Sequence, residues 1–116
     1  MSRTLCDKQM CAATVVDRSG VVLAMARSEN AGPHTLGASQ GKAFTSASAR
    51  NLTSTIAKGL EANPGLADIP GYLVLAGGAP IRVGGAVVGA VGVGGAPSGL
   101  IDETCGTDAV TTVLGK

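Results

Sequence analysis

The stretch GGAPIRVGGAVVGAVGVGGA, residues 77–96, carries the strongest structural signal in the chain. Glycine fills eight of its twenty positions, and the rest are mostly Val, Ala and Ile. A collagen helix needs glycine at every third residue, which this stretch does not have. Disorder is disfavoured because β-branched residues fill the spaces between the glycines. We therefore predict two short strands, 80–83 and 86–93, joined by a two-residue hairpin at Gly84-Gly85.

Three more glycines, Gly89, Gly92 and Gly94, lie inside or at the end of the second of these strands. Glycine within a strand packs poorly, but it lets another backbone or a flat ligand approach closely. The dinucleotide fingerprint G-x-G-x-x-G is not met, because Pro97 stands where a third glycine would follow Gly92 and Gly94. The stretch therefore predicts a β-meander whose last strand can be approached closely by another backbone or a flat ligand, and not a phosphate-binding loop.

The first half of the chain predicts a hairpin and then two helices. Residues 12–27 form two apolar segments, rich in β-branched residues, that turn at 17–20. A helix is expected from Thr35, its N-cap, and a second helix over 53–60. The apolar residues at helical spacing in the first of these helices are Leu36, Ala43, Phe44 and Ala47.

The second half adds a strand and a helix to the glycine-rich stretch. Residues 72–75 are predicted to form a strand because they are β-rich and end at a glycine pair. Residues 98–114 are predicted to form a C-terminal helix, opened by Ser98 or by Asp102-Glu103.

The composition indicates one domain over residues 1–116 and excludes some partners. The net charge is +1 and no basic block occurs, so nucleic acid is not an expected partner. Phe44 and Tyr72 are the only aromatic residues, and a core of small aliphatic side chains buries less area per residue. We therefore expect the chain to bury further apolar surface between subunits.

The three cysteines, Cys6, Cys11 and Cys105, are odd in number and show no C-x-x-C spacing. Reduced thiols are therefore expected, and not a disulfide framework or a zinc site. The first residues contain no apolar leader segment, and the longest uncharged run near the glycines, 83–98, is too short to span a membrane. These features predict a cytoplasmic protein with no membrane partner.

The sequence GASQG, residues 37–41, fits the G-x-S-x-G pattern of a hydrolase nucleophile at Ser39. That turn needs a strand directly before the serine and a histidine far downstream of it. Here a Gly-Pro loop precedes Ser39, and the only histidine, His34, comes before it. A serine hydrolase is therefore disfavoured.

A few polar residues remain as candidates for a binding site. His34 is the one side chain able to titrate near neutral pH or to ligate haem iron, although most loop histidines are simply solvated. Lys42 and Arg50 lie near one helix face, which is either a solvated surface or an anchor for carboxylates. Asp102 and Glu103, together with Asp108, are candidates for binding a hard cation, or they stabilise the start of a helix.

Four segments, taken in order, resemble the GlcG/HbpS-like haem-binding family, which includes the C-terminal domain of PduO-type proteins. They are VVDRSGVVLAMAR (15–27), ASQGKAFTSASARNLTS (38–54), the glycine-rich stretch and DETCGTDAV (102–110). The resemblance covers about residues 12–112. It implies a profilin-like α/β (α+β) fold, in which an antiparallel sheet is flanked by helices. It also implies assembly into homo-oligomers.

The same resemblance implies haem as the cofactor, with haem handling or redox sensing as the role. It places the pocket near the predicted helix and its preceding loop, so the implied site residues are His34, Lys42, Arg50 and Thr53, with His34 or Thr53 nearest the iron. The family usually has a longer helix before the first strand, and a proline before the residue matched by Thr53. A haem ligand carried on that longer helix is not expected here.

Two other functions remain open from the sequence. The domain could be an accessory protein or enzyme acting on a small carboxylate such as glycolate, with Lys42 and Arg50 binding the acid and His34 moving a proton. Alternatively, it could be a structural oligomer with no small-molecule ligand.

Overall fold

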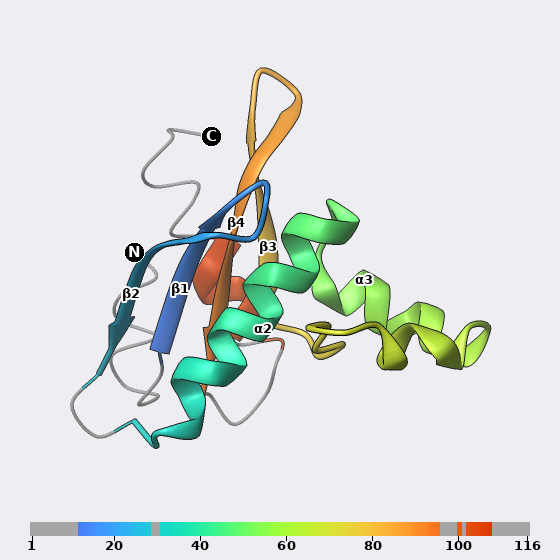
Figure 1. Cartoon of the computed structure of the whole chain (residues 1–116), viewed down its shortest axis with the longest axis horizontal. Helices are drawn as coiled ribbons and strands as arrows, with labels where there is room; N and C mark the ends of the chain where they lie inside the picture. The colour runs from blue at the N-terminus through green and yellow to red at the C-terminus, as the bar shows by residue number, and fades with distance from the viewer. Residues whose placement is uncertain (1–11, 29–30, 96–99, 101, 108–116) are drawn as a thin grey trace.

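Strands and helices make up most of the residues that the structure, a computed structural model, describes: 12–28, 31–95, 100 and 102–107 (Figure 1). The strands are β1 (Ala12–Asp17), β2 (Val22–Arg27), β3 (Gly78–Val83) and β4 (Ala86–Gly94). The α-helices are α2 (His34–Ala49) and α3 (Thr53–Lys58), and two short 3-10 helices follow them, η1 (Gly59–Glu61) and η2 (Pro64–Asp68). Residues 102–107 are also helical.

The four strands form one antiparallel sheet in the order β2-β1-β4-β3. Both predicted hairpins are present. The first turns where Asp17 Oδ1 accepts hydrogen bonds from the N–H groups of Ser19 (2.8 Å) and Val21 (3.1 Å). The second turns at Gly84 and Gly85, whose φ angles of 60° and 83° suit a two-residue hairpin.

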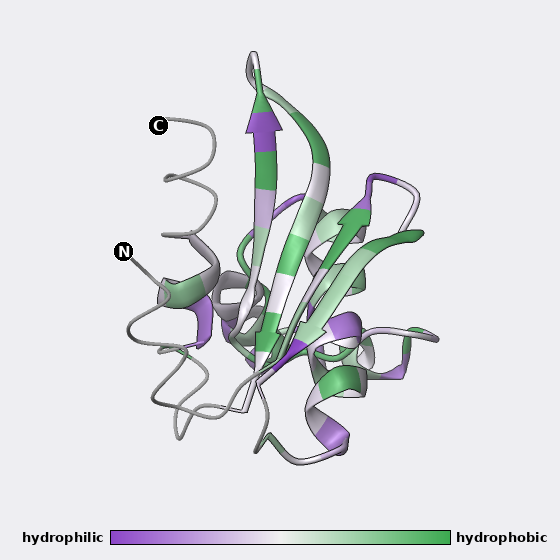
Figure 2. Ribbon diagram, turned by 90° about the vertical axis from the view of Figure 1, so that its left-hand side faces the viewer, coloured by the Kyte–Doolittle hydropathy of each residue, from purple (hydrophilic) through white to green (hydrophobic). Residues whose placement is uncertain are grey.

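Helices cover the two faces of the sheet. The helix α2 packs on one face, where Val16, Ala43 and Ala90 are buried together. The helical residues 102–107 lie on the other face, which Figure 2 shows to the left of the sheet. There Cys105 joins a buried cluster with Ala79, Val91 and Val93. The predicted α+β fold, an antiparallel sheet flanked by helices, is therefore confirmed.

The glycines of β4 allow α2 to approach the sheet closely. A Cβ atom at Gly92 would meet the carbonyl oxygen of Ser39 and would lie 2.5 Å from the backbone nitrogen of Ala43. At the same interface the hydroxyl groups of Thr14 and Ser39 are 2.6 Å apart. At this face of the sheet, the glycines of β4 therefore make room for the backbone of α2.

Several predicted elements or element ends differ from the structure. The strand β3 begins at Gly78, before the predicted 80, and β4 ends at Gly94, after the predicted 93. Residues 72–75 are not a strand, because the N–H of Leu73 donates to Thr45 Oγ1 (2.8 Å) on α2 and not to a neighbouring strand. The N-cap of α2 is Pro33, since the Thr35 hydroxyl donates to the carbonyl of Gly32 (2.6 Å). The second helix ends at Lys58, before the predicted 60. The predicted C-terminal helix is described only in part, because residues 108–114 lie outside the described residues.

The prediction of reduced cysteines is wrong for Cys105, which is disulfide-bonded. Its side chain is buried in the cluster beneath residues 102–107. An odd number of cysteines does not prevent two of them from pairing when the fold brings them together. The chain's other cysteines, Cys6 and Cys11, lie outside the described residues.

Candidate functional site

A buried lysine in the middle of α2, Lys42, forms an ion pair inside the protein. The Nζ atom of Lys42 donates to the carbonyl oxygen of Val93 (3.1 Å) and to Asp102 Oδ2 (3.0 Å). Lys42 is 5% exposed and Asp102 is 2% exposed. A buried charge is tolerated when it is paired and hydrogen-bonded, and both conditions are met here.

Two glycines make room for this lysine. Gly77 has a φ angle of 138°, and a Cβ atom there would lie 2.6 Å from Lys42 Cδ. A Cβ atom at Gly78 would meet the backbone oxygen of Lys42 and would lie 2.7 Å from Thr53 Cγ2. Any side chain at either position would displace the lysine or the helix that carries it. The absence of side chains at Gly77 and Gly78 therefore leaves the space that the Lys42 side chain occupies on its way to Asp102.

Thr53 closes the other side of the glycine pair. Its side chain is buried, and Thr53 Oγ1 accepts a hydrogen bond of 2.8 Å from the N–H of Gly78. The same oxygen lies 3.5 Å from the carbonyl of Gly78. We call Lys42, Thr53, Gly77, Gly78 and Asp102 the glycine-pair junction. It joins α2, α3, β3 and the helical residues 102–107.

Glu103 connects residues 102–107 to α3. Its carboxylate accepts hydrogen bonds from the N–H of Ser54 (2.9 Å) and from the Ser54 hydroxyl (2.6 Å). Asp102 and Glu103 thus bind two different helices, α2 and α3. Among the described residues, no group of three His, Cys, Asp or Glu side chains could hold a metal ion.

The four residues expected to form a site separate into two groups. Lys42 and Thr53 meet at the glycine-pair junction and are buried. His34 and Arg50 are exposed, one at the first residue of α2 and the other just beyond its last residue. A helix of sixteen residues is about 24 Å long, so these two side chains start far apart within one chain.

The surroundings of His34 and Arg50 differ. The position that a Cβ atom of Gly32 would take lies 2.8 Å from His34 Nδ1, so the imidazole folds back over the loop before α2. Arg50 has a left-handed backbone with φ 57°, and its carbonyl oxygen accepts a hydrogen bond of 3.1 Å from Arg82 Nη2. Two arginines therefore share the C-terminal end of α2, where the helix dipole favours cations.

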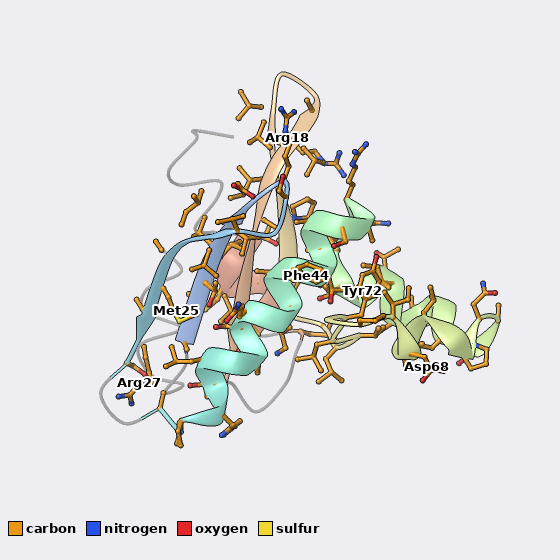
Figure 3. The ribbon with its side chains drawn as sticks, in the orientation of Figure 1. Arg18, Met25, Arg27, Phe44, Asp68 and Tyr72 are labelled. Atoms are coloured by element: carbon orange, nitrogen blue, oxygen red, sulfur yellow. The ribbon has the colours of Figure 1, made fainter. Side chains whose placement is uncertain are left out.

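The pairing of Lys42 with Asp102 and the aromatic contact of Phe44 were not found by sequence reasoning. Phe44 and Tyr72 pack edge to face with ring centroids 6.3 Å apart (Figure 3). Phe44 also lies close to Gly20 and Gly71, where a Cβ atom would come within 2.9 Å of the ring. Both glycines have positive φ angles. In the sequence, these two glycines indicate turns, but a glycine at a turn does not show that the ring of Phe44 packs against it.

Haem in proteins needs a ligand to the iron and cations for its propionates. His34 and Arg50 fit these needs, because both are exposed. Lys42 and Thr53 do not fit direct contact within one chain, because they are buried and their polar atoms bind protein groups. Of the four expected residues, His34 and Arg50 are therefore accessible at the surface, and Lys42 and Thr53 are buried in the glycine-pair junction.

The family model described as "Haem degrading protein HbpS-like" matches residues 2–111. The chain belongs to the HbpS-like family. HbpS, whose crystal structure is known, is 42% identical in sequence to this chain, and the two structures match with a TM-score of 0.91. The match covers 99% of this chain and 82% of the HbpS chain. A double mutant of HbpS from Streptomyces reticuli is 44% identical, with a TM-score of 0.89, and the match covers 95% and 75% of the two chains.

A more distant neighbour shares the fold of the HbpS-like chain. The PduOC:heme complex is 15% identical, with a TM-score of 0.82 and coverage of 95% of this chain and 84% of that one. No match was found among curated proteins. The described residues include no helix long and apolar enough to cross a membrane.

Proposed function

We propose that this HbpS-like domain binds haem, as a homo-oligomer, and takes part in haem handling. The observation that carries the proposal is the family match over residues 2–111, together with 42% identity to HbpS over 99% of the chain. The distant PduOC neighbour, whose crystal structure is a complex with haem, supports the same ligand. When bound, haem supplies a redox-active iron.

The four expected residues take different roles in this proposal. His34 is the proposed ligand to the iron, because its imidazole is exposed at the start of α2. Arg50, with Arg82 beside it, pairs with the propionates. Lys42 and Thr53 act from behind the surface by fixing Gly77-Gly78, and so the start of β3.

The separation of His34 from Arg50 favours an oligomer. Because about 24 Å of helix lies between them, a single haem can reach both only if a second copy of the chain supplies one of them. The cytoplasmic location predicted from the sequence stays a proposal. The disulfide of Cys105 is the observation against it, since disulfides persist mainly in oxidising compartments.

A hemin titration followed by absorbance tests the proposal. The unmodified chain is expected to show a saturable Soret band with a defined stoichiometry. His34→Ala should shift or remove that band, because the iron loses its ligand. Arg50→Ala should weaken binding by roughly tenfold, the effect of losing one charge-assisted hydrogen bond.

Gln40→Ala is the matched control, because Gln40 is exposed on the same helix. It should leave both the band and the affinity unchanged. A response that does not saturate would contradict haem binding. In that case a thermal shift with glycolate would test the small-carboxylate alternative, since a ligand that binds only the native state raises the melting temperature.

A further inference from the structure

The guanidinium of Arg82 is held against the end of α2. Its Nη2 atom donates a hydrogen bond of 3.1 Å to the carbonyl oxygen of Arg50, the residue that directly follows the helix. Both side chains are exposed, and they come from different elements, one from β3 and the other from the end of α2. Two cationic side chains therefore share one small region of the surface.

The pairing of β3 with β4 becomes irregular where Arg82 begins. Ile81 pairs with Gly89 and Arg82 pairs with Val87, so Val88 is the extra residue of a β-bulge. A bulge bends the strand pair and changes the direction of nearby side chains, and bulges are frequent next to functional sites. The bend therefore lies at the residue whose side chain reaches across to α2.

The backbone of Arg50 also points to a use for its side chain. Its φ angle is 57°, and among the described residues no other residue besides glycine has a positive φ. Glycine is the usual residue directly after a helix, because it adopts this backbone without a steric cost. Nor does the helix dipole require a second cation, since Arg82 already binds the end of α2.

Neither arginine forms an ion pair with a carboxylate in the part of the chain that the structure describes. The carboxylates of Asp17, Asp102 and Glu103 accept hydrogen bonds from other groups. Two cations that share a region of the surface repel each other, and an anion bound by both removes this repulsion. A guanidinium has five N–H donors in a planar fork that matches the two oxygens of a carboxylate. The binding of Arg82 to the Arg50 carbonyl leaves most of these donors for a ligand.

We propose that Arg50 and Arg82 form a carboxylate-binding subsite, in which Arg82 determines the selectivity for a carboxylate over its ester. This inference rests on the haem binding proposed above, and it names the group of haem that is recognised, the propionate. Because Arg82 is anchored on the Arg50 carbonyl, its guanidinium is partly ordered before the ligand arrives. A propionate ester has no anionic oxygen for a charge-assisted hydrogen bond, so the subsite selects the free acid.

Parallel absorbance titrations of the full chain with hemin and with hemin dimethyl ester test this subsite. The unmodified protein should bind hemin about tenfold or more tightly than the ester, the effect of at least one charge-assisted hydrogen bond. Arg82→Gln should bring the ratio of the two affinities close to one by weakening hemin and not the ester. Arg82→Lys keeps the charge but loses the planar fork, so its ratio should lie between the other two.

Lys58→Gln is the control for a general loss of positive charge, because Lys58 is exposed at the end of α3. It should keep the ratio of the unmodified protein. Circular dichroism on each sample verifies that the variants are folded. An equal affinity for hemin and its ester, or a ratio that Arg82→Gln leaves unchanged, would overturn the subsite while haem binding stands.

Glycolate distinguishes the two sources of a carboxylate, a propionate of haem and a small free acid. If the subsite binds the propionate, glycolate in excess should leave both the melting temperature and the hemin affinity unchanged. A rise in melting temperature with glycolate that Arg82→Gln abolishes would assign the subsite to a small acid and overturn the propionate. A chain that binds neither porphyrin in a saturable way would overturn the haem proposal and this subsite together.

Discussion

The Nζ atom of Lys42 lies 3.0 Å from Oδ2 of Asp102, sixty residues further along the chain, and both side chains are buried. This contact fixes residues 102–107 against α2 across the end of the sheet. It is possible only because Gly77 leaves space beside the lysine side chain.

Breaking the pair from one side should destabilise the fold strongly. Lys42→Met leaves the Asp102 carboxylate buried without its cation, and the free energy of unfolding should fall by about 3–5 kcal/mol. Urea denaturation measures the change. The double variant Lys42→Met with Asp102→Leu should recover most of the loss, because no buried charge remains. A double variant as unstable as the single one would mean that packing, not charge, sets the cost.

Gly92 should not tolerate even one methyl group. Gly92→Ala would push Ser39 and Ala43 away from β4, and the free energy of unfolding should fall by about 1–3 kcal/mol or more. Gly37→Ala is the matched control on α2, where nothing lies within 4 Å of the added Cβ. It should stabilise the protein by about 0.5–1 kcal/mol, since alanine favours a helix. Equal effects at the two sites would contradict the close approach of α2.

Substitutions at Thr53 test whether its hydroxyl group has a structural role or binds the haem iron. Thr53→Val keeps the shape but removes the acceptor of the Gly78 N–H, so the free energy of unfolding should fall by about 1–3 kcal/mol. Thr53→Ser retains the hydroxyl and should lose less stability. The Soret band of the hemin titration should be the same for both folded variants. A band altered only in Thr53→Val would instead place this hydroxyl next to the iron.

The disulfide of Cys105 should contribute to stability. Reduction with dithiothreitol should lower the free energy of unfolding by about 2–4 kcal/mol, because the unfolded chain regains conformational freedom. Alkylation before and after reduction, read by mass spectrometry of peptides, reports which cysteines are paired. Labelling of Cys105 under native, non-reducing conditions would rule the bond out.

Much of the fold is predictable because its signals are local. The turns at Asp17–Gly20 and Gly84-Gly85 depend on residues that adopt turn backbones by themselves, and both hairpins form there. The helical spacing of Ala43 and Ala47 predicted α2 in the same way, and both side chains are buried where α2 packs on the sheet. Residues 72–75 have strand propensity, but Thr45 binds the N–H of Leu73 and keeps the segment out of the sheet.

The sequence by itself determined the turns, the main helix and the family, because each depends on neighbouring residues or on their order along the chain. The tertiary structure alone decided what the polar side chains do. Lys42 has the charge of a surface anchor, yet folding places it beside Asp102 inside the protein. The cost of burying this charge is offset by partners 51 and 60 residues away, Val93 and Asp102, and no local pattern records those distances.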